Sequence, residues 1–143
     1  MQHIWSVLCR KSIIDSETNL LSMLDSFEEL TVDLAKNYKG ESINIPLEFE
    51  LVSYWVTEKQ EGPESQKVLI ELKNPQNEVI KKFDQLIKLK KNNQRLRACL
   101  RIKGIGLTGE GKYVIQVKHK GEKSKNYKKV SEIPFYVKFN YQK

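Results

Sequence analysis

The stretch that decides the fold is Arg95-Leu96-Arg97-Ala98-Cys99-Leu100-Arg101-Ile102-Lys103, in which polar and apolar side chains alternate without a break. Successive side chains of a β-strand point to opposite sides of the sheet. The alternation therefore predicts a strand with one buried and one exposed face. We expect the buried face to carry Leu96, Ala98, Leu100 and Ile102, and the exposed face to carry Arg95, Arg97, Cys99, Arg101 and Lys103.

The same two-residue period recurs along most of the chain, often between turn-forming residues. It predicts strands over 43–57, 67–73, 78–82, 83–89, 95–107, 113–117 and 133–139, with turns at 60–65 and 74–77. Residues 19–30 have apolar spacing that suits a helix as well as a strand. We favour the strand because the other segments are strands and the following Thr31-Val32 is typical of β structure.

A chain of 143 residues has the size of one domain, so we expect a single domain over residues 1–143. Regularly spaced short strands predict an all-β fold, an antiparallel β-sandwich of about seven to nine strands. The longest apolar runs are far shorter than a membrane span. The first ten residues lack the pattern of a secretory signal, and two cysteines allow at most one disulfide, which together favour the cytoplasm.

The sequence has a glycine-rich turn with a tyrosine, Gly109-Glu110-Gly111-Lys112-Tyr113, followed by a strand to Val117. This segment resembles the corner before strand F of immunoglobulin-like sandwiches, where a tyrosine hydroxyl bonds back to the preceding loop. The resemblance implies an immunoglobulin-like sandwich with Tyr113 as that tyrosine, and it transfers no function. The segments 3–9 and 132–137 are similar to those of small uncharacterised bacterial proteins, a resemblance that implies no activity.

Catalytic and cofactor signatures are weak in this sequence. The glycines of 104–109 match G-x-G-x-x-G, but a strand follows them where a phosphate-binding motif needs a helix. The chain has two histidines, His3 and His119, and two cysteines, Cys9 and Cys99, which we expect to be reduced and mostly buried. A Cys/His pair stays open as an alternative. We expect no metal, no cofactor and no enzymatic activity, and packing roles for Trp5 and Trp55.

Charge divides the chain sharply. Residues 1–66 hold 5 basic and 12 acidic side chains, and residues 67–143 hold 20 and 6. The basic row, defined as Arg95, Arg97, Arg101 and Lys103, would line one sheet face and bind a polyanion. Lysines 118, 120, 128 and 129 extend this candidate site, with Tyr127 as a stacking residue; further lysines at 88, 90, 91, 112, 123 and 125 would widen it.

Neighbouring strands can cancel this basic surface. In an immunoglobulin-like strand order, the acids at 25, 28, 29 or 33 would lie opposite the arginines. Glu48 and Glu50 would then lie beside Lys112 and Lys118. Cross-strand pairs of opposite charge would leave little net potential, and we favour this outcome.

The function that these observations favour is a non-catalytic module that binds a protein partner or a second copy of itself, since sandwiches have exposed edge strands. The alternative is a nucleic-acid-binding domain that uses the basic row.

Overall fold

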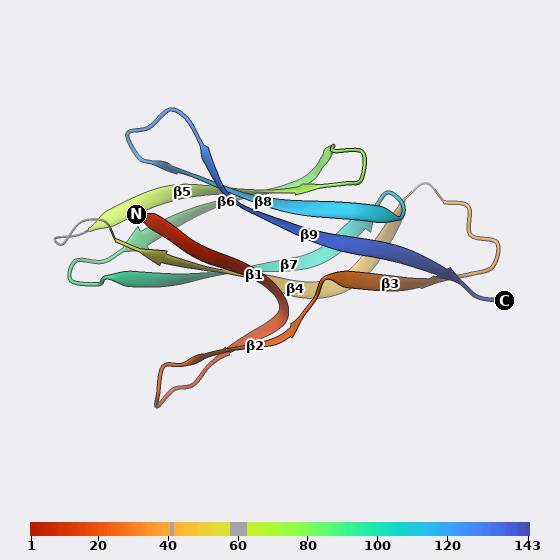
Figure 1. The fold of residues 1–143 in the computed structure, drawn as a ribbon, viewed down its shortest axis with the longest axis horizontal. Coiled ribbons are helices and arrows are strands. Elements are labelled where there is room, and N and C mark those ends of the chain that lie inside the picture. The colour runs from red at the N-terminus through yellow and green to blue at the C-terminus, as the bar shows by residue number, and fades with distance from the viewer. Residues whose placement is uncertain (41, 58–62) are drawn as a thin grey trace.

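The computed structural model describes residues 1–40, 42–57 and 63–143 and contains, within these ranges, nine β-strands and no helix (Figure 1). The strands are β1 (Gln2–Ile14), β2 (Leu21–Ser26), β3 (Glu29–Leu34), β4 (Ile43–Val56), β5 (Glu64–Lys73), β6 (Val79–Leu89), β7 (Arg95–Leu107), β8 (Gly111–Gly121) and β9 (Lys128–Tyr141). They form two sheets that pack on a shared core. The predicted all-β sandwich is confirmed.

The strand order places β7 at an edge. The four-stranded sheet has the order β2-β1-β4-β7, and the five-stranded sheet has the order β3-β9-β8-β5-β6. All neighbours are antiparallel except β3 and β9, which run parallel. The basic strand β7 therefore has one partner in its sheet, β4, while the lysine-rich strand β8 lies in the other sheet.

Large side chains fill the space between the sheets, as the alternation predicts. Phe49 and Trp55 of β4 and Tyr113 and Phe135 of the opposite sheet have 0% exposure. The rings of Tyr113 and Phe135 stack with centroids 5.4 Å apart, and Phe27 meets Phe135 edge-on at 5.8 Å. Burying such rings is the main favourable contribution to the fold.

The predicted hydrogen bond of Tyr113 is present at the corner between β7 and β8. Its hydroxyl accepts from the backbone N–H of Thr108 at 3.0 Å and donates to the carbonyl of Gly109 at 2.7 Å. Gly111 follows with φ +132°, and a Cβ there would lie 3.0 Å from Pro75. Only glycine fits this conformation without strain. No helix begins here, so 104–109 is a strand end and a turn rather than a phosphate loop.

Three expectations about local structure can be compared with the strands, and one strand was not predicted. The segment 19–30 contains β2 and the start of β3, so the preference for strand was right. The two strands expected over 78–89 are one strand, β6, and β1 was not predicted. Of the turn expected at 60–65, residues 60–62 lie outside the described residues, and Glu64 and Ser65 already belong to β5.

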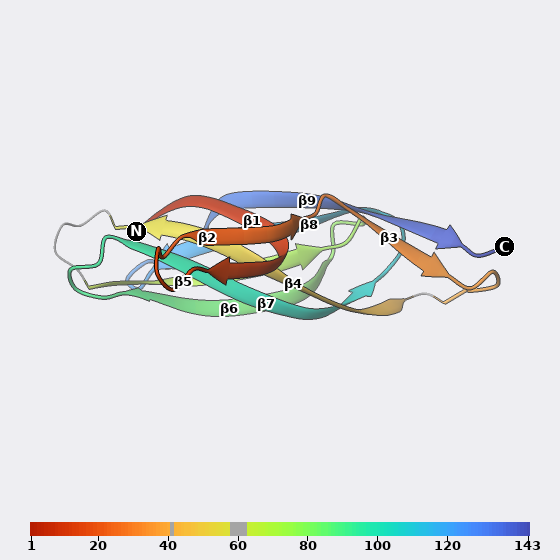
Figure 2. The ribbon, with the colours of Figure 1, turned by 90° about the horizontal axis from the view of Figure 1, so that it is seen from below.

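The end of β1 and β2 fold back across the outer face of the four-stranded sheet (Figure 2). β1 pairs with β4 up to Cys9 opposite Glu50 and then leaves it. Beyond that point the Ser12 N–H donates to the Glu50 carboxylate at 2.7 Å. Near the hairpin tip, the Asn19 carbonyl accepts from Arg97 of β7 at 2.6 Å. We call residues 10–26 the folded-back hairpin.

Candidate functional site

The basic row lies on the outer face of the four-stranded sheet, as predicted, but it is partly neutralised. Arg101 and Lys103 are paired in register with Glu50 and Glu48 of β4. The charged atoms are 3.6 Å apart in the Arg101–Glu50 pair and 4.0 Å apart in the Lys103–Glu48 pair. The expectation that neighbouring acids reduce this surface was right for these two members. The partners expected for the two glutamates were wrong, because Lys112 and Lys118 belong to the other sheet.

The acids expected opposite the arginines, at 25, 28, 29 and 33, do not lie opposite β7, which corrects a second expectation. Asp25 pairs with Arg10 at 2.7 Å, and Glu29 pairs with Lys138 at 3.0 Å. Asp33 accepts a hydrogen bond from Asn140. The physical reason is strand order, because β1 separates β2 from β4 and β3 joins the five-stranded sheet beside β9.

The folded-back hairpin binds Arg97, a third member of the basic row. Arg97 donates to the Asn19 carbonyl, and its other terminal nitrogen is buried without a hydrogen-bond partner among the described residues. A guanidinium held in this way is not available to a polyanion. Arg95 is exposed. The basic row is therefore not a continuous binding surface.

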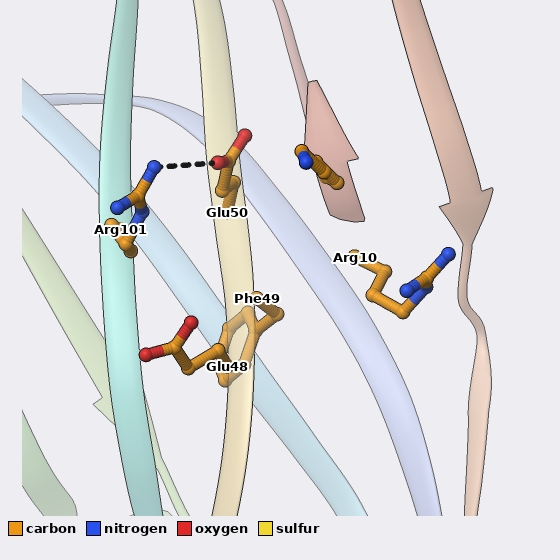
Figure 3. Close-up of a pocket in the computed structure, with 6 residues that line it drawn as sticks. Arg10, Glu48, Phe49, Glu50 and Arg101 are labelled. Carbon is orange, nitrogen blue, oxygen red and sulfur yellow. Dashed lines mark ion pairs between the residues drawn. The ribbon is translucent and has the colours of Figure 1, made fainter. Parts of the chain in front are cut away.

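A pocket of about 360 Å³ opens between the hairpin and the sheet (Figure 3). It is lined by Arg10, Lys11, Glu48, Phe49, Glu50 and Arg101. Figure 3 shows Arg10 and Arg101 on opposite sides of the pocket, with the two glutamates on the strand between them. Because Arg10 is already bound to Asp25 and Arg101 to Glu50, neither guanidinium is left uncompensated for an anionic ligand.

Glu50 is the most constrained group of this pocket. It is 5% exposed and accepts hydrogen bonds from the Ser12 hydroxyl at 2.5 Å and the Ser12 N–H at 2.7 Å. The Ser12 hydroxyl is the largest cause that holds the pKa of Glu50 below its ordinary value, against the opposing effect of burial. The carboxylate is thus ionised, fastens the hairpin to the sheet and is a poor general base.

The two thiols lie near this cluster and have little nucleophilic character. Cys9 is buried, but Cys99 is exposed, which corrects the expectation that both are mostly buried. Cys99 Sγ lies 3.8 Å from Ser12 Oγ. Desolvation raises the pKa of both thiols and the negative charge of Glu50 adds to this rise, while the Ser12 hydroxyl opposes part of it at Cys99. A thiol with a raised pKa is mostly protonated at neutral pH and reacts slowly.

The two histidines are placed elsewhere, around Trp55 in the core. The centroids of the His3 and His119 rings lie 4.9 and 5.3 Å from the Trp55 ring. His3 bonds to Ser6, and burial lowers its pKa, as does the proximity of His119. His119 bonds to Gln66. The hydrogen bonds of the two histidines go to Ser6 and Gln66, and Cys99 lies beside Ser12, so the Cys/His alternative gains no support.

The remaining predicted polyanion-binding residues occupy the opposite side of the molecule. Lys118 and Lys120 lie on β8 and Lys128 and Lys129 on β9, in the five-stranded sheet. Lys118 stands directly opposite Lys129, and Lys120 stands opposite Lys67 of β5. The predicted site is therefore two separate surfaces. Sequence reasoning missed Lys67, whose position depends on the register between β5 and β8.

The four edge strands differ in the charges that protect them. β7 carries the basic row, β6 carries Lys81, Lys82, Asp84 and Lys88, and β3 carries Glu29 and Asp33. β2, with the sequence LSMLDS, has one charged residue, Asp25, which is paired with Arg10. Charges on an edge oppose pairing with another chain, so β2 is the least protected edge.

The same hairpin concentrates exposed apolar side chains. Of the ten large hydrophobic residues that are exposed in the described part of the chain, four belong to it: Ile13 at 46%, Ile14 at 54%, Leu20 at 67% and Leu24 at 39%. Scattered exposed apolar residues are ordinary, but a group of them on one element marks an interaction surface.

Comparisons with known proteins assign no relative. No family model matches the chain, and no curated protein matches its sequence. In the described ranges, no helix is long and apolar enough to cross a membrane. The described side chains contain no group of three or more histidine, cysteine or acidic residues that would hold a metal ion.

Proposed function

We propose that this protein is a non-catalytic binding module that associates with a second copy of itself through the folded-back hairpin. The observation that carries the proposal is the unprotected edge of β2 beside four exposed apolar side chains. An edge strand pairs with its own copy around a two-fold axis without any other partner, and two-fold dimers are the commonest assemblies. Burial of the apolar side chains would supply the free energy of association.

The setting proposed for this module is the cytoplasm, and the proposed fold family is immunoglobulin-like. The two cysteines are unpaired, which fits a reducing compartment. The Tyr113 corner supports the family assignment, although the parallel pairing of β3 with β9 adds a feature outside a purely antiparallel sandwich.

Sedimentation equilibrium from micromolar to millimolar protein tests the association. We expect a concentration-dependent mass that approaches two chains. Leu24→Lys places a charge on the hairpin surface and should weaken the dimer by about tenfold or more. Val79→Lys is the matched control, because Val79 has the same exposure of 39% and lies on β6.

Two outcomes would contradict the proposal. The first is a single-chain mass at every concentration, which would leave the hairpin surface to a different protein. The second is an equal loss of association in both lysine variants, which would place the contact outside the hairpin. Circular dichroism of both variants checks that each keeps its β structure.

A further inference from the structure

Like charges face each other at one end of the five-stranded sheet. In the pairing of β5 with β8, Lys67 is directly opposite Lys120, and in the pairing of β8 with β9, Lys118 is directly opposite Lys129. Like charges opposite each other destabilise a sheet. Two such pairs on neighbouring strands are therefore not explained by the stability of the fold.

One of the two pairs is compensated within the chain. Lys118 Nζ lies 2.6 Å from Glu71, and Lys129 Nζ lies 2.7 Å from Glu132. The other pair is not, because no carboxylate of the described residues lies within 4.0 Å of the ammonium of Lys67 or of Lys120. This pair leaves two positive charges side by side on an open sheet face.

A hollow of about 350 Å³ adjoins this uncompensated pair. It is lined by Lys67, Val68, Asp84, Gln85, Leu86 and Tyr127. The Lys120 ammonium lies over the ring of Tyr127, 4.6 Å from its centroid. Leu86, directly opposite Lys67 on β6, is 49% exposed. Two cations, an aromatic ring and an exposed apolar side chain thus lie together around the hollow.

The surroundings of the hollow are also basic. The end of β6 and the β8–β9 turn lie at the same end of the molecule (Figure 1). These segments add the exposed lysines 88, 123, 125 and 128, against one exposed acid of the turn, Glu122. A concentration of one sign of charge attracts an oppositely charged polymer and raises its association rate.

We infer that this hollow binds single-stranded nucleic acid. Lys67 and Lys120 would contact backbone phosphates, a base would stack on Tyr127 and Leu86, and Asp84 would accept from an exocyclic amino group. A single strand is the favoured class because its bases offer free faces for stacking, whereas a duplex hides them. The inference is independent of the association proposed for the hairpin.

Fluorescence anisotropy with a labelled oligodeoxycytidylate of about twelve nucleotides, whose bases carry an exocyclic amino group, tests the inference. We expect binding that weakens steeply between about 50 and 200 mM salt. The double variant Lys67→Gln, Lys120→Gln should lose about tenfold in affinity at low salt and lower the salt slope by about 1.4. The matched control is Lys36→Gln, Lys39→Gln, which removes two exposed lysines outside this sheet end.

Tyr127→Leu separates nucleic acid from other polyanions. It should weaken oligonucleotide binding about fivefold or more by loss of stacking and leave heparin binding unchanged. The inference is overturned if the oligonucleotide does not bind at low salt. It is also overturned if the control double variant loses as much affinity as the test variant, since binding would then follow net charge alone. Equal loss of heparin and oligonucleotide binding in Tyr127→Leu would assign the hollow to polyanions in general.

Discussion

The two outer faces of the sandwich both carry basic strands, and they differ in how the charges are compensated. On the four-stranded sheet, the glutamates of β4 stand beside the basic row, and the folded-back hairpin covers its centre. On the five-stranded sheet, Lys67 and Lys120 face each other without a carboxylate of the described residues within ion-pair distance. A basic strand therefore forms a basic surface only where its neighbour in the sheet does not neutralise it.

Each face also contains one buried glutamate, and the two glutamates have different structural roles. Glu50 is 5% exposed and joins the hairpin to the sheet, whereas Glu71 is 6% exposed and holds Lys118 on an uncovered face. Substitution of each residue in turn therefore distinguishes two roles. Glu50 holds two parts of the structure together, and Glu71 neutralises a surface lysine.

Glu50→Gln should lower the stability of the fold more than any other substitution proposed for the two faces. The variant weakens the two hydrogen bonds from Ser12 and removes the charge that faces Arg101, so we expect the free energy of unfolding to fall by about 2 kcal/mol. Urea denaturation measures this fall. Glu48→Gln is the control, since the Glu48–Lys103 pair is exposed and worth less than about 0.5 kcal/mol. Equal effects of the two variants would mean that the hairpin is not fastened by Glu50.

A smaller effect is expected from acid. The Ser12 hydroxyl lowers the pKa of Glu50, and the Lys118 ammonium lowers the pKa of Glu71, both from an ordinary value of 4.5. A carboxyl with a lowered pKa in the folded state contributes stability above its unfolded pKa. That contribution is lost as the pH falls through the folded value.

The urea midpoint should therefore be insensitive to these two groups at neutral pH and should decline below about pH 4.5. Glu71→Gln should flatten part of this decline and lower stability at neutral pH by about 1 kcal/mol. A decline of unchanged steepness in Glu71→Gln would show that the Lys118 contact does not contribute.

Most of the strands and the Tyr113 corner could be predicted from the sequence, because each depends on a few neighbouring residues. The alternation in β7 and the position of Tyr113 before a strand each depend on a few neighbouring residues. β1 was missed because both of its faces are covered near its middle. Leu8 faces the core and Cys9 lies at the base of the hairpin, and both are buried, so the two-residue period disappears.

The candidate sites depended on strand order and register, which the sequence does not specify locally. The insertion of β1 beside β4 decided which acids meet the basic row. The register of β5 against β8 decided that Lys67 meets Lys120. One signal was available in Leu51-Val52, where two successive apolar residues interrupt the alternation of β4 and indicate local cover on both faces; both are buried in the structure.

The folded-back hairpin lies over β7, and an engineered cross-link tests this placement. Ser12 Oγ is 3.8 Å from Cys99 Sγ, so Ser12→Cys in a Cys9→Ser background should form a disulfide with Cys99 within one chain under mild oxidation. Ser22→Cys in the same background is the control, because Ser22 is paired with Ile13 on the exposed side of the hairpin. Mass spectrometry of the oxidised, monomeric protein measures the bridge. We expect an intramolecular disulfide in the first variant alone. Its absence, or equal bridging in both variants, would mean that the hairpin does not lie over β7.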